Sequence, residues 1–246
     1  MSAYAFLGAG EFEDWHSDID RSLLDGRSGL VLVLATASAP EGDEVYQGWV
    51  DKGLKHYADA GIEAVAPSLR TRDDAHDAAI VAQVDEAAMV FFSGGNPAYL
   101  AKVLVGSPVW RRIRERIGDG SLAYGGCSAG VACLSDPTFD SDTEDAEHVW
   151  APGLGYFPSI LFAPHWDIVE TWIPGAQAFI TAATPAGGTL VAIDEQTALV
   201  GDGAQWATHG AGAVYVHHDG AWVAEYRAGD RWELAMALGG ATPAAG

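Results

Sequence analysis

The feature that most constrains the fold is a series of short segments that are apolar throughout. A strand with one face in water alternates apolar and polar residues, whereas a strand buried on both faces does not. Stretches with helical periodicity separate these segments, and together they predict an α/β fold with a doubly wound, mostly parallel sheet flanked by helices. The predicted strands cover residues 3–8, 30–36, 62–67, 88–95 and 122–127, and the predicted helices cover 43–60, 74–86 and 107–118.

The pattern changes after residue 150, where shorter apolar segments follow one another with tight turns between them. Asp219-Gly220, between two such segments, is a typical hairpin turn. The sequence shows no internal repeat and no linker, and 246 residues are enough for one large domain. We therefore expect residues 1–246 to form a single domain with a strand-rich C-terminal part.

The charge and the cysteine content exclude several classes of protein. The formal net charge of −21 would repel a phosphate backbone, so we expect no nucleic-acid partner. The N-terminus lacks a signal peptide and no apolar run reaches about 18 residues, so we expect neither secretion nor a membrane span. Two cysteines do not make a disulfide scaffold, and a cytoplasmic protein is expected. The sequence leaves open whether the chain forms a homo-oligomer.

The segment Gly126-Cys127-Ser128-Ala129-Gly130 contains two neighbouring nucleophiles. It matches the pattern G-x-S-x-G, in which the central residue occupies a tight turn between a strand and a helix. Ser128 has glycine two positions before and two positions after it, whereas Cys127 has Ala129 at the second position after it. The glycine spacing therefore assigns the turn to Ser128, and Cys127 is expected to end the strand as a buried apolar residue.

A serine nucleophile needs a base within hydrogen-bond reach, and the chain offers eight histidines. His165 directly follows an apolar segment, so it is expected at the carboxyl end of a strand, where sites form in doubly wound sheets. His209 and His217 remain alternatives, because an α/β-hydrolase-type esterase would take its histidine from near the C-terminus.

Five blocks of the sequence, taken in order, resemble peptidase family S51, which includes dipeptidase E and cyanophycinase. They cover residues 7–12 with 32–42, 91–100, 124–134, 153–167 and 191–200. The resemblance implies a fold similar to the class I glutamine amidotransferase domain. It further implies Ser128 as nucleophile, His165 as general base, and the backbone N–H groups of Gly95 and Ala129 as the oxyanion hole.

The resemblance leaves the acid of the triad undecided. The family places it between the serine and the histidine, and counting from neighbouring landmarks favours Asp142. Glu144 and Asp145 are alternatives in the same acidic segment, and Glu195 is a fourth candidate outside it. Asn96, in the glycine-rich block, and Trp166, beside the histidine, are expected in the substrate pocket.

The leading hypothesis is a serine hydrolase, a small-peptide exopeptidase that cleaves a small peptide or amide through an acyl-enzyme. An esterase and a catalytically inactive binding domain are the alternatives. No cofactor and no metal are expected, since the acidic segment lacks the glycine and glutamate of a calcium loop. No Lys or Arg occurs from residue 118 to residue 226, so a substrate carboxylate would need Arg70 or Arg72.

Overall fold

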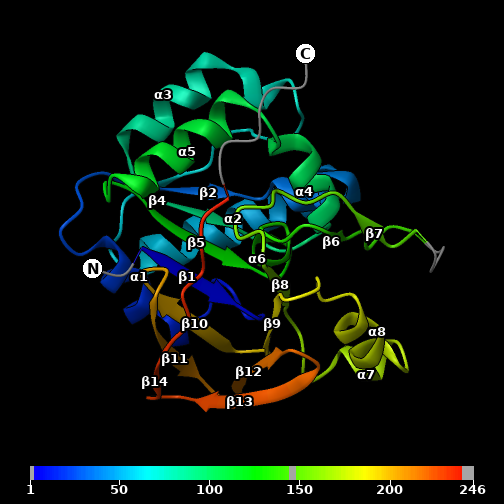
Figure 1. The fold of residues 1–246 in the computed structure, drawn as a ribbon. Helices are drawn as coiled ribbons and strands as arrows, with labels where there is room; N and C mark the ends of the chain where they lie inside the picture. The colour runs from blue at the N-terminus through cyan, green and yellow to red at the C-terminus, as the bar shows by residue number, and fades with distance from the viewer. Residues whose placement is uncertain (1–2, 144–147, 240–246) are drawn as a thin grey trace.

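The computed structural model describes residues 3–143 and 148–239, which form two sheets with helices around them (Figure 1). The larger sheet has the strand order β14-β11-β10-β1-β5-β4-β2-β3. Its parallel part consists of β1 (Tyr4–Leu7), β5 (Ala123–Cys127), β4 (Ala87–Phe92), β2 (Leu30–Leu34) and β3 (Ala64–Val65). The strands β10 (Thr197–Gly201), β11 (Gln205–Gly210) and β14 (Arg231–Glu233) extend it in antiparallel fashion.

Helices cover both faces of this sheet, which confirms the predicted α/β class. The helices α1 (Ser17–Leu24) and α2 (Asp43–Asp59) pack on one face, and α3 (Ala78–Glu86) and α5 (Pro108–Gly118) pack on the other. The remaining helices are α4 (Pro97–Leu104), α6 (Ala129–Ala132), α7 (Val169–Trp172) and α8 (Ala176–Ala182), with short 3-10 turns at Asp14–His16, Thr36–Glu41 and Asp74–His76. No helix in residues 3–143 or 148–239 is both long enough and apolar enough to cross a bilayer.

Two of the helices begin with a capping residue followed by proline. Asn96 before α4 and Ser107 before α5 each accept a backbone N–H bond with the side chain, and a proline follows each of them. Proline suits the first helical position because its missing N–H would have no partner there. The predicted helix over residues 107–118 is thereby confirmed almost to its ends.

The strand-rich C-terminal part forms a second sheet with the order β13-β12-β9-β8. The strands are β8 (Ile160–Ala163), β9 (Thr189–Ile193), β12 (Ala213–His218) and β13 (Ala221–Arg227), and only β8 and β9 are parallel. Asp219 and Gly220 both have positive φ in the turn between β12 and β13, which confirms the predicted hairpin. A further pair, β6 (Thr138–Phe139) and β7 (Trp150–Ala151), projects from the body of the molecule (Figure 1).

Aromatic side chains join the two sheets in one core. The ring of Phe6, on β1, lies 5.1 Å from the ring of Phe162, on β8, and both side chains are buried. Phe157 and Trp206 complete the contact, with ring centroids 5.9 and 5.6 Å from that of Phe6. This packing fixes the carboxyl ends of β8 and β9 relative to those of β1 and β5.

We predict that Gly8 and Gly48 respond in opposite directions to alanine. A Cβ atom on Gly8 would lie 2.0 Å from the backbone oxygen of Asp194, so Gly8→Ala should lower the free energy of unfolding by about 2–4 kcal/mol. Gly48 is exposed within α2 with nothing within 4 Å of such an atom, so Gly48→Ala should raise that free energy by about 0.5–1 kcal/mol. Urea unfolding followed by circular dichroism measures both, and equal effects would contradict the prediction.

Candidate active site

Ser128 occupies a strained turn between β5 and α6. Its φ of 51° is rare for a residue with a side chain, and its N–H donates to the oxygen of Leu7, 3.0 Å away. A Cβ atom on Gly126 would lie 2.5 Å from the oxygen of Gly130, and one on Gly130 would lie 2.3 Å from the oxygen of Phe92. Both glycines are therefore required by the turn, which is centred on Ser128 as their spacing predicts.

A continuous chain of hydrogen bonds joins Ser128, His165 and Glu195. The Oγ atom of Ser128 lies 2.8 Å from Nε2 of His165, and Nδ1 of the same ring lies 2.8 Å from Oε1 of Glu195. The side chains of His165 and Glu195 are 22% and 35% exposed, so substrate and water can reach the histidine. This geometry allows the imidazole to take a proton from the hydroxyl while the carboxylate orients the ring.

The parallel pairing of β8 and β9 explains why His165 and Glu195 meet. Ala163 is the register partner of Ala192, and His165 and Glu195 each lie two residues beyond the end of their strand. The N–H of Trp166 donates to the oxygen of Ile193 at 3.1 Å and ties the two loops together. His165 itself has a φ of 58°, which turns its ring from the strand end toward Ser128.

The acid that the structure places against His165 is Glu195, so the preference for Asp142 is corrected. Asp142 is exposed on the turn after β6, where its backbone N–H donates to Oδ1 of Asp140. Burial, and to a smaller extent the charge of Asp142, raises the pKa of Glu41. Counting along the chain failed because it takes no account of the pairing of β8 with β9, which brings Glu195 to His165. Glu144 and Asp145 lie outside the described residues.

Two backbone N–H groups beside Ser128 are free to bind a substrate oxygen. Among the described residues, neither the N–H of Gly95 nor that of Ala129 has a hydrogen-bond acceptor. A Cβ atom on Gly95 would lie 2.4 Å from the backbone carbon of Ala37, and the residue has a φ of 133°, so the loop requires glycine there. The loop lies beside the nucleophile, since a Cβ atom on Gly94 would be 3.8 Å from Oγ of Ser128.

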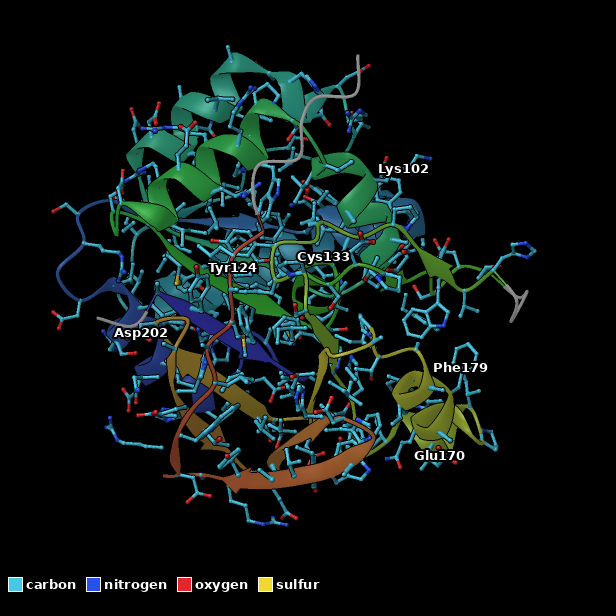
Figure 2. The ribbon with its side chains drawn as sticks, in the orientation of Figure 1. Lys102, Tyr124, Cys133, Glu170, Phe179 and Asp202 are labelled. Atoms are coloured by element: carbon cyan, nitrogen blue, oxygen red, sulfur yellow. The ribbon has the colours of Figure 1, made fainter. Side chains whose placement is uncertain are left out.

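A cavity of about 900 Å³ opens beside Ser128 and His165. It lies between the β6–β7 pair and the α7–α8 segment, where Phe179 stands at the side of the molecule (Figure 2). Its walls are mainly apolar, as is usual for small-molecule sites. Apart from Gly95, Ser128, Ala129 and His165, they include Pro97, Ala132, Phe139, Val149, Trp150, Leu161, Phe162, Val169, Trp172, Ile173, Phe179 and Ile180.

The two residues predicted for the pocket do not line this cavity. Asn96 is buried as the cap of α4, where its Oδ1 accepts the N–H of Tyr99 and its Nδ2 donates to Asp140 at 2.7 Å. Trp166 is buried with Leu161 and Leu190 in the core behind the second sheet. The arginines expected to hold a substrate carboxylate are also engaged elsewhere. Arg70 pairs with Asp43, and Arg72 donates to two backbone carbonyls.

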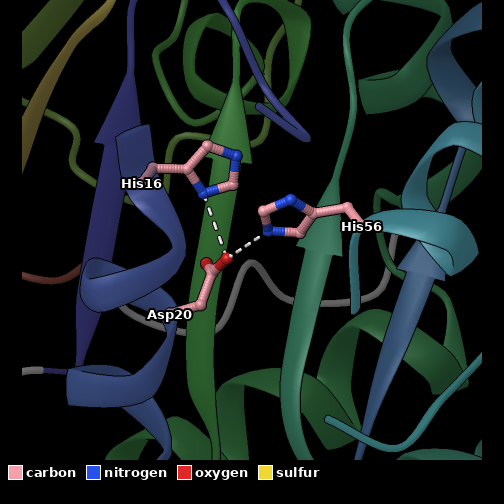
Figure 3. Close-up of side chains that lie close together, drawn as sticks. All are labelled: His16, Asp20 and His56. Atoms are coloured by element: carbon pink, nitrogen blue, oxygen red, sulfur yellow. Dashed lines mark hydrogen bonds and ion pairs between the residues drawn. The ribbon is translucent and has the colours of Figure 1, made fainter. Parts of the chain in front are cut away.

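Within residues 3–143 and 148–239, one group of side chains has the composition of a metal site. His16, Asp20 and His56 are buried together, with Oδ2 of Asp20 lying 3.0 Å from Nδ1 of His16 and 2.9 Å from Nε2 of His56 (Figure 3). The N–H of Phe12 donates to Nε2 of His16, so the ring carries its proton on Nδ1. A cation at Nδ1 would have to displace that proton, and the arrangement therefore fits a polar cluster better than a metal centre.

Glu11 was missed as a site residue, and Glu195 was ranked too low. Glu11, in the first block of the family resemblance, lies buried directly beside Cys127 and Gly94. Glu195 had a usable signal, because an acid that follows an apolar strand is expected at the same sheet edge as His165. The pairing of β8 with β9 was the missing information.

A hydroxyl, an imidazole and a carboxylate meet here at strand ends, and hydrolases with an activated side-chain nucleophile use the same arrangement. The comparison with known families agrees, since the profile of peptidase family S51 matches residues 5–208. The chain therefore belongs to peptidase family S51. The match confirms the family resemblance that the sequence motifs predicted.

Known proteins show how far the likeness extends. Cyanophycinases from Nostoc and from Geminocystis herdmanii are 28% identical over 119 and 103 residues, which is 46% and 40% of this chain. The matches span only 40% and 38% of those proteins. The crystal structure of a peptidase from an acI-B1 actinobacterium aligns with a TM-score of 0.83 and 28% identity, covering 94% of this chain and 96% of that one. The crystal structure of a putative peptidase E protein from Listeria monocytogenes shares the fold, with a TM-score of 0.58 and 17% identity, covering 89% of this chain and 99% of that one.

We predict that neither cysteine reacts in the folded protein. Burial raises the pKa of the Cys127 thiol well above its usual range and raises that of Cys133 to about 12. Both thiols are therefore protonated at pH 8, and only the thiolate is a nucleophile. Iodoacetamide at pH 8 should modify the folded protein at least about 100-fold more slowly than the protein in guanidinium, as followed by mass spectrometry. Rapid modification of folded Cys127 would contradict this assignment.

Proposed function

We propose that the protein is a serine peptidase in which Ser128, His165 and Glu195 form the catalytic triad. The single observation that carries the proposal is the unbroken hydrogen-bond chain from Oγ of Ser128 through the His165 ring to Glu195, with both distances at 2.8 Å. Membership of a peptidase family supplies the reaction class, and the geometry supplies the groups.

The reaction begins when Oγ of Ser128 attacks the scissile carbonyl and its proton passes to Nε2 of His165. Glu195 accepts the hydrogen bond from Nδ1 and stabilises the imidazolium that forms. The carbonyl oxygen becomes an oxyanion, and the N–H groups of Gly95 and Ala129 donate to it. His165 then returns the proton to the leaving amine, and water cleaves the acyl-enzyme by the same steps in reverse.

The substrate we propose is a small peptide or amide cleaved as an exopeptidase would cleave it. The cavity beside Ser128 is of the size that holds small molecules, and relatives in the family include peptidases. The unpaired N–H groups and the intact hydrogen-bond chain disfavour an inactive binding domain. The esterase alternative needed His209 or His217 as base, and these residues lie on β11 and β12, whereas His165 holds Ser128.

We predict that substitutions of the proposed triad residues lower kcat strongly, whereas substitution of Asp142 does not. Ser128→Ala and His165→Ala should each lower kcat by at least about 10⁴-fold, and Glu195→Gln should lower it by about 10²- to 10⁴-fold because the ring loses its orienting carboxylate. Asp142→Asn removes the same charge from an exposed residue and should leave kcat within about twofold. Hydrolysis of p-nitrophenyl acetate and labelling by a fluorophosphonate probe measure all four variants.

Three further results distinguish the proposed serine peptidase from the alternative hypotheses for the site. His209→Ala should label at the wild-type rate. If Ser128 fails to react with the probe between pH 6 and 9 in protein whose circular dichroism is native, the serine peptidase is rejected. Full activity in His165→Ala would remove the histidine from the mechanism.

A further inference from the structure

The cavity beside Ser128 has no positively charged wall. All Lys and Arg residues of the chain lie among the described residues, and none of them lines the cavity. Arg70 and Arg72 are the two cations that the sequence analysis expected to bind a substrate carboxylate. Arg70 pairs with Asp43, and Arg72 donates to the backbone carbonyls of Lys102 and Val105. A carboxylate buried in this cavity would therefore lose its hydration without gaining a partner, which is strongly unfavourable.

Large apolar side chains stand at the mouth of the cavity and remain exposed. Trp172, Ile173 and Phe179 are 57%, 55% and 42% exposed, although such residues are usually buried. The Phe179 ring stacks on Trp150 at 5.7 Å, so α8 and the β6–β7 pair share one apolar wall. The Trp172 ring lies 5.1 Å from that of His165, which extends this wall to the base. An exposed apolar patch of this kind beside a reactive group marks a binding site.

We propose that this cavity binds a bulky apolar side chain, aromatic or long aliphatic, on the residue whose carbonyl Ser128 attacks. The inference rests on the proposed function and names its substrate class. Ser128, Gly95 and Ala129 line the same cavity as the apolar side chains, so a carbonyl at Ser128 places the side chain next to it among those apolar walls. Peptides that present Asp or Arg at this position are selected against, because each would bury a charge among apolar walls.

A dipeptide series tests the proposal directly. Phe-Ala, Leu-Ala, Asp-Ala and Arg-Ala differ only in the side chain that enters the cavity, and release of alanine is measured by chromatography. Phe-Ala and Leu-Ala should exceed Asp-Ala and Arg-Ala in kcat/KM by about 10- to 100-fold, the effect of burying one apolar side chain. Preference for Asp-Ala or Arg-Ala, or equal rates, overturns the proposal.

A charge placed on the apolar wall tests the same point from the protein side. Phe179→Arg should lower kcat/KM for Phe-Ala roughly tenfold and raise it for Asp-Ala, because the guanidinium supplies the missing partner. Val223→Arg is the matched control, since Val223 is 59% exposed on β13 and does not line the cavity. An unchanged preference in Phe179→Arg contradicts the proposed occupant.

Labelling of Ser128 separates failure of this inference from failure of the proposed function. If the fluorophosphonate probe labels Ser128 but no dipeptide is cleaved, acetyl-phenylalaninal and acetyl-aspartal are compared as competitors of the probe. Stronger protection by the phenylalanine aldehyde supports the apolar cavity, and equal or weaker protection overturns it. If Ser128 does not react at all, the serine peptidase fails first.

A second observation concerns Glu11, which joins the nucleophile strand to the loop of Gly95. Oε1 of Glu11 accepts the N–H of Gly94 at 2.9 Å, and Oε2 accepts the thiol of Cys127 at 3.1 Å. Gly94 directly precedes Gly95, and Cys127 directly precedes Ser128. The side chain is 5% exposed, so this carboxylate bridges the two halves of the site out of reach of water.

Phe12, next to Glu11, has a positive φ angle, as do residues in or next to the proposed triad. Five residues other than glycine have positive φ among those described, and one of them, Asp219, belongs to a hairpin turn. The other four are Ser128, His165, Gln196 beside Glu195, and Phe12 beside Glu11. Phe12 is held by the His16 ring, which accepts its N–H, and Asp20 and His56 pack behind that ring (Figure 3). Strain of this kind persists where the surroundings fix a functional geometry.

We infer that Glu11 is a positioning residue that fixes the N–H of Gly95 relative to Oγ of Ser128. It does not reach the substrate, and it acts through the N–H of Gly94 and the thiol of Cys127. The amide of Gln can still accept from Gly94, whereas Asp is too short to reach both partners and Ala reaches neither.

Three variants test this role with p-nitrophenyl acetate and with the number of active sites titrated by the fluorophosphonate probe. Glu11→Ala and Glu11→Asp should lower kcat per titrated site about 10²- to 10³-fold, the effect of losing one oxyanion donor, with KM within about threefold. Glu11→Gln should restore kcat to within about tenfold of wild type. A purely structural role would reduce the number of sites and leave kcat per site unchanged, which overturns the inference, as does a Gln variant no better than Ala. If Glu11→Ala does not fold, the comparison of Asp with Gln decides.

Discussion

The alignment of the candidate active site depends on how the second sheet packs against the first. Ser128 stands on the larger sheet, whereas His165 and Glu195 stand on the smaller one, so the 2.8 Å bond between Oγ and Nε2 crosses from one sheet to the other. The contact of Phe6 with Phe162, together with Phe157 and Trp206, fixes the position of one sheet relative to the other. Close-packed protein interiors resist small displacements, which keeps the hydrogen bond between Oγ of Ser128 and Nε2 of His165 short.

Most of the fold could be predicted from the sequence because it follows from local rules. Strands buried on both faces leave wholly apolar segments, and Ser107-Pro108 and Asp219-Gly220 mark a helix start and a hairpin through their own backbone preferences. Ser128 was identified in the same way, since only glycine fits at positions 126 and 130 of the turn. Each of these signals lies within a few residues of the structure that it specifies.

The partner of His165 and the lining of the cavity were not fixed by local sequence signals, because they depend on pairing between distant segments. Glu195 meets His165 only through the parallel pairing of β8 with β9, a contact between residues 30 positions apart. Glu11 lies 83 and 116 positions from its two partners. Trp166, adjacent to His165 in the sequence, is buried with Leu161 and Leu190 and does not line the cavity. Proximity in the sequence did not predict the role of a residue where that role depends on the direction of its side chain.

The hydrogen-bonded groups and the cavity walls come from different parts of the fold, which has a consequence for how members of this family can differ. Ser128, His165 and Glu195 follow strands that the core holds in place, whereas Trp150, Trp172 and Phe179 come from the β6–β7 pair and the α7–α8 segment. Glu195, not a residue of the β6–β7 pair, contacts His165, so the pair supplies cavity walls and none of the three hydrogen-bonded groups. Substitutions on this pair would therefore alter the cavity and leave those three groups in place. Members of such a family can thus keep one set of polar groups while their cavities diverge.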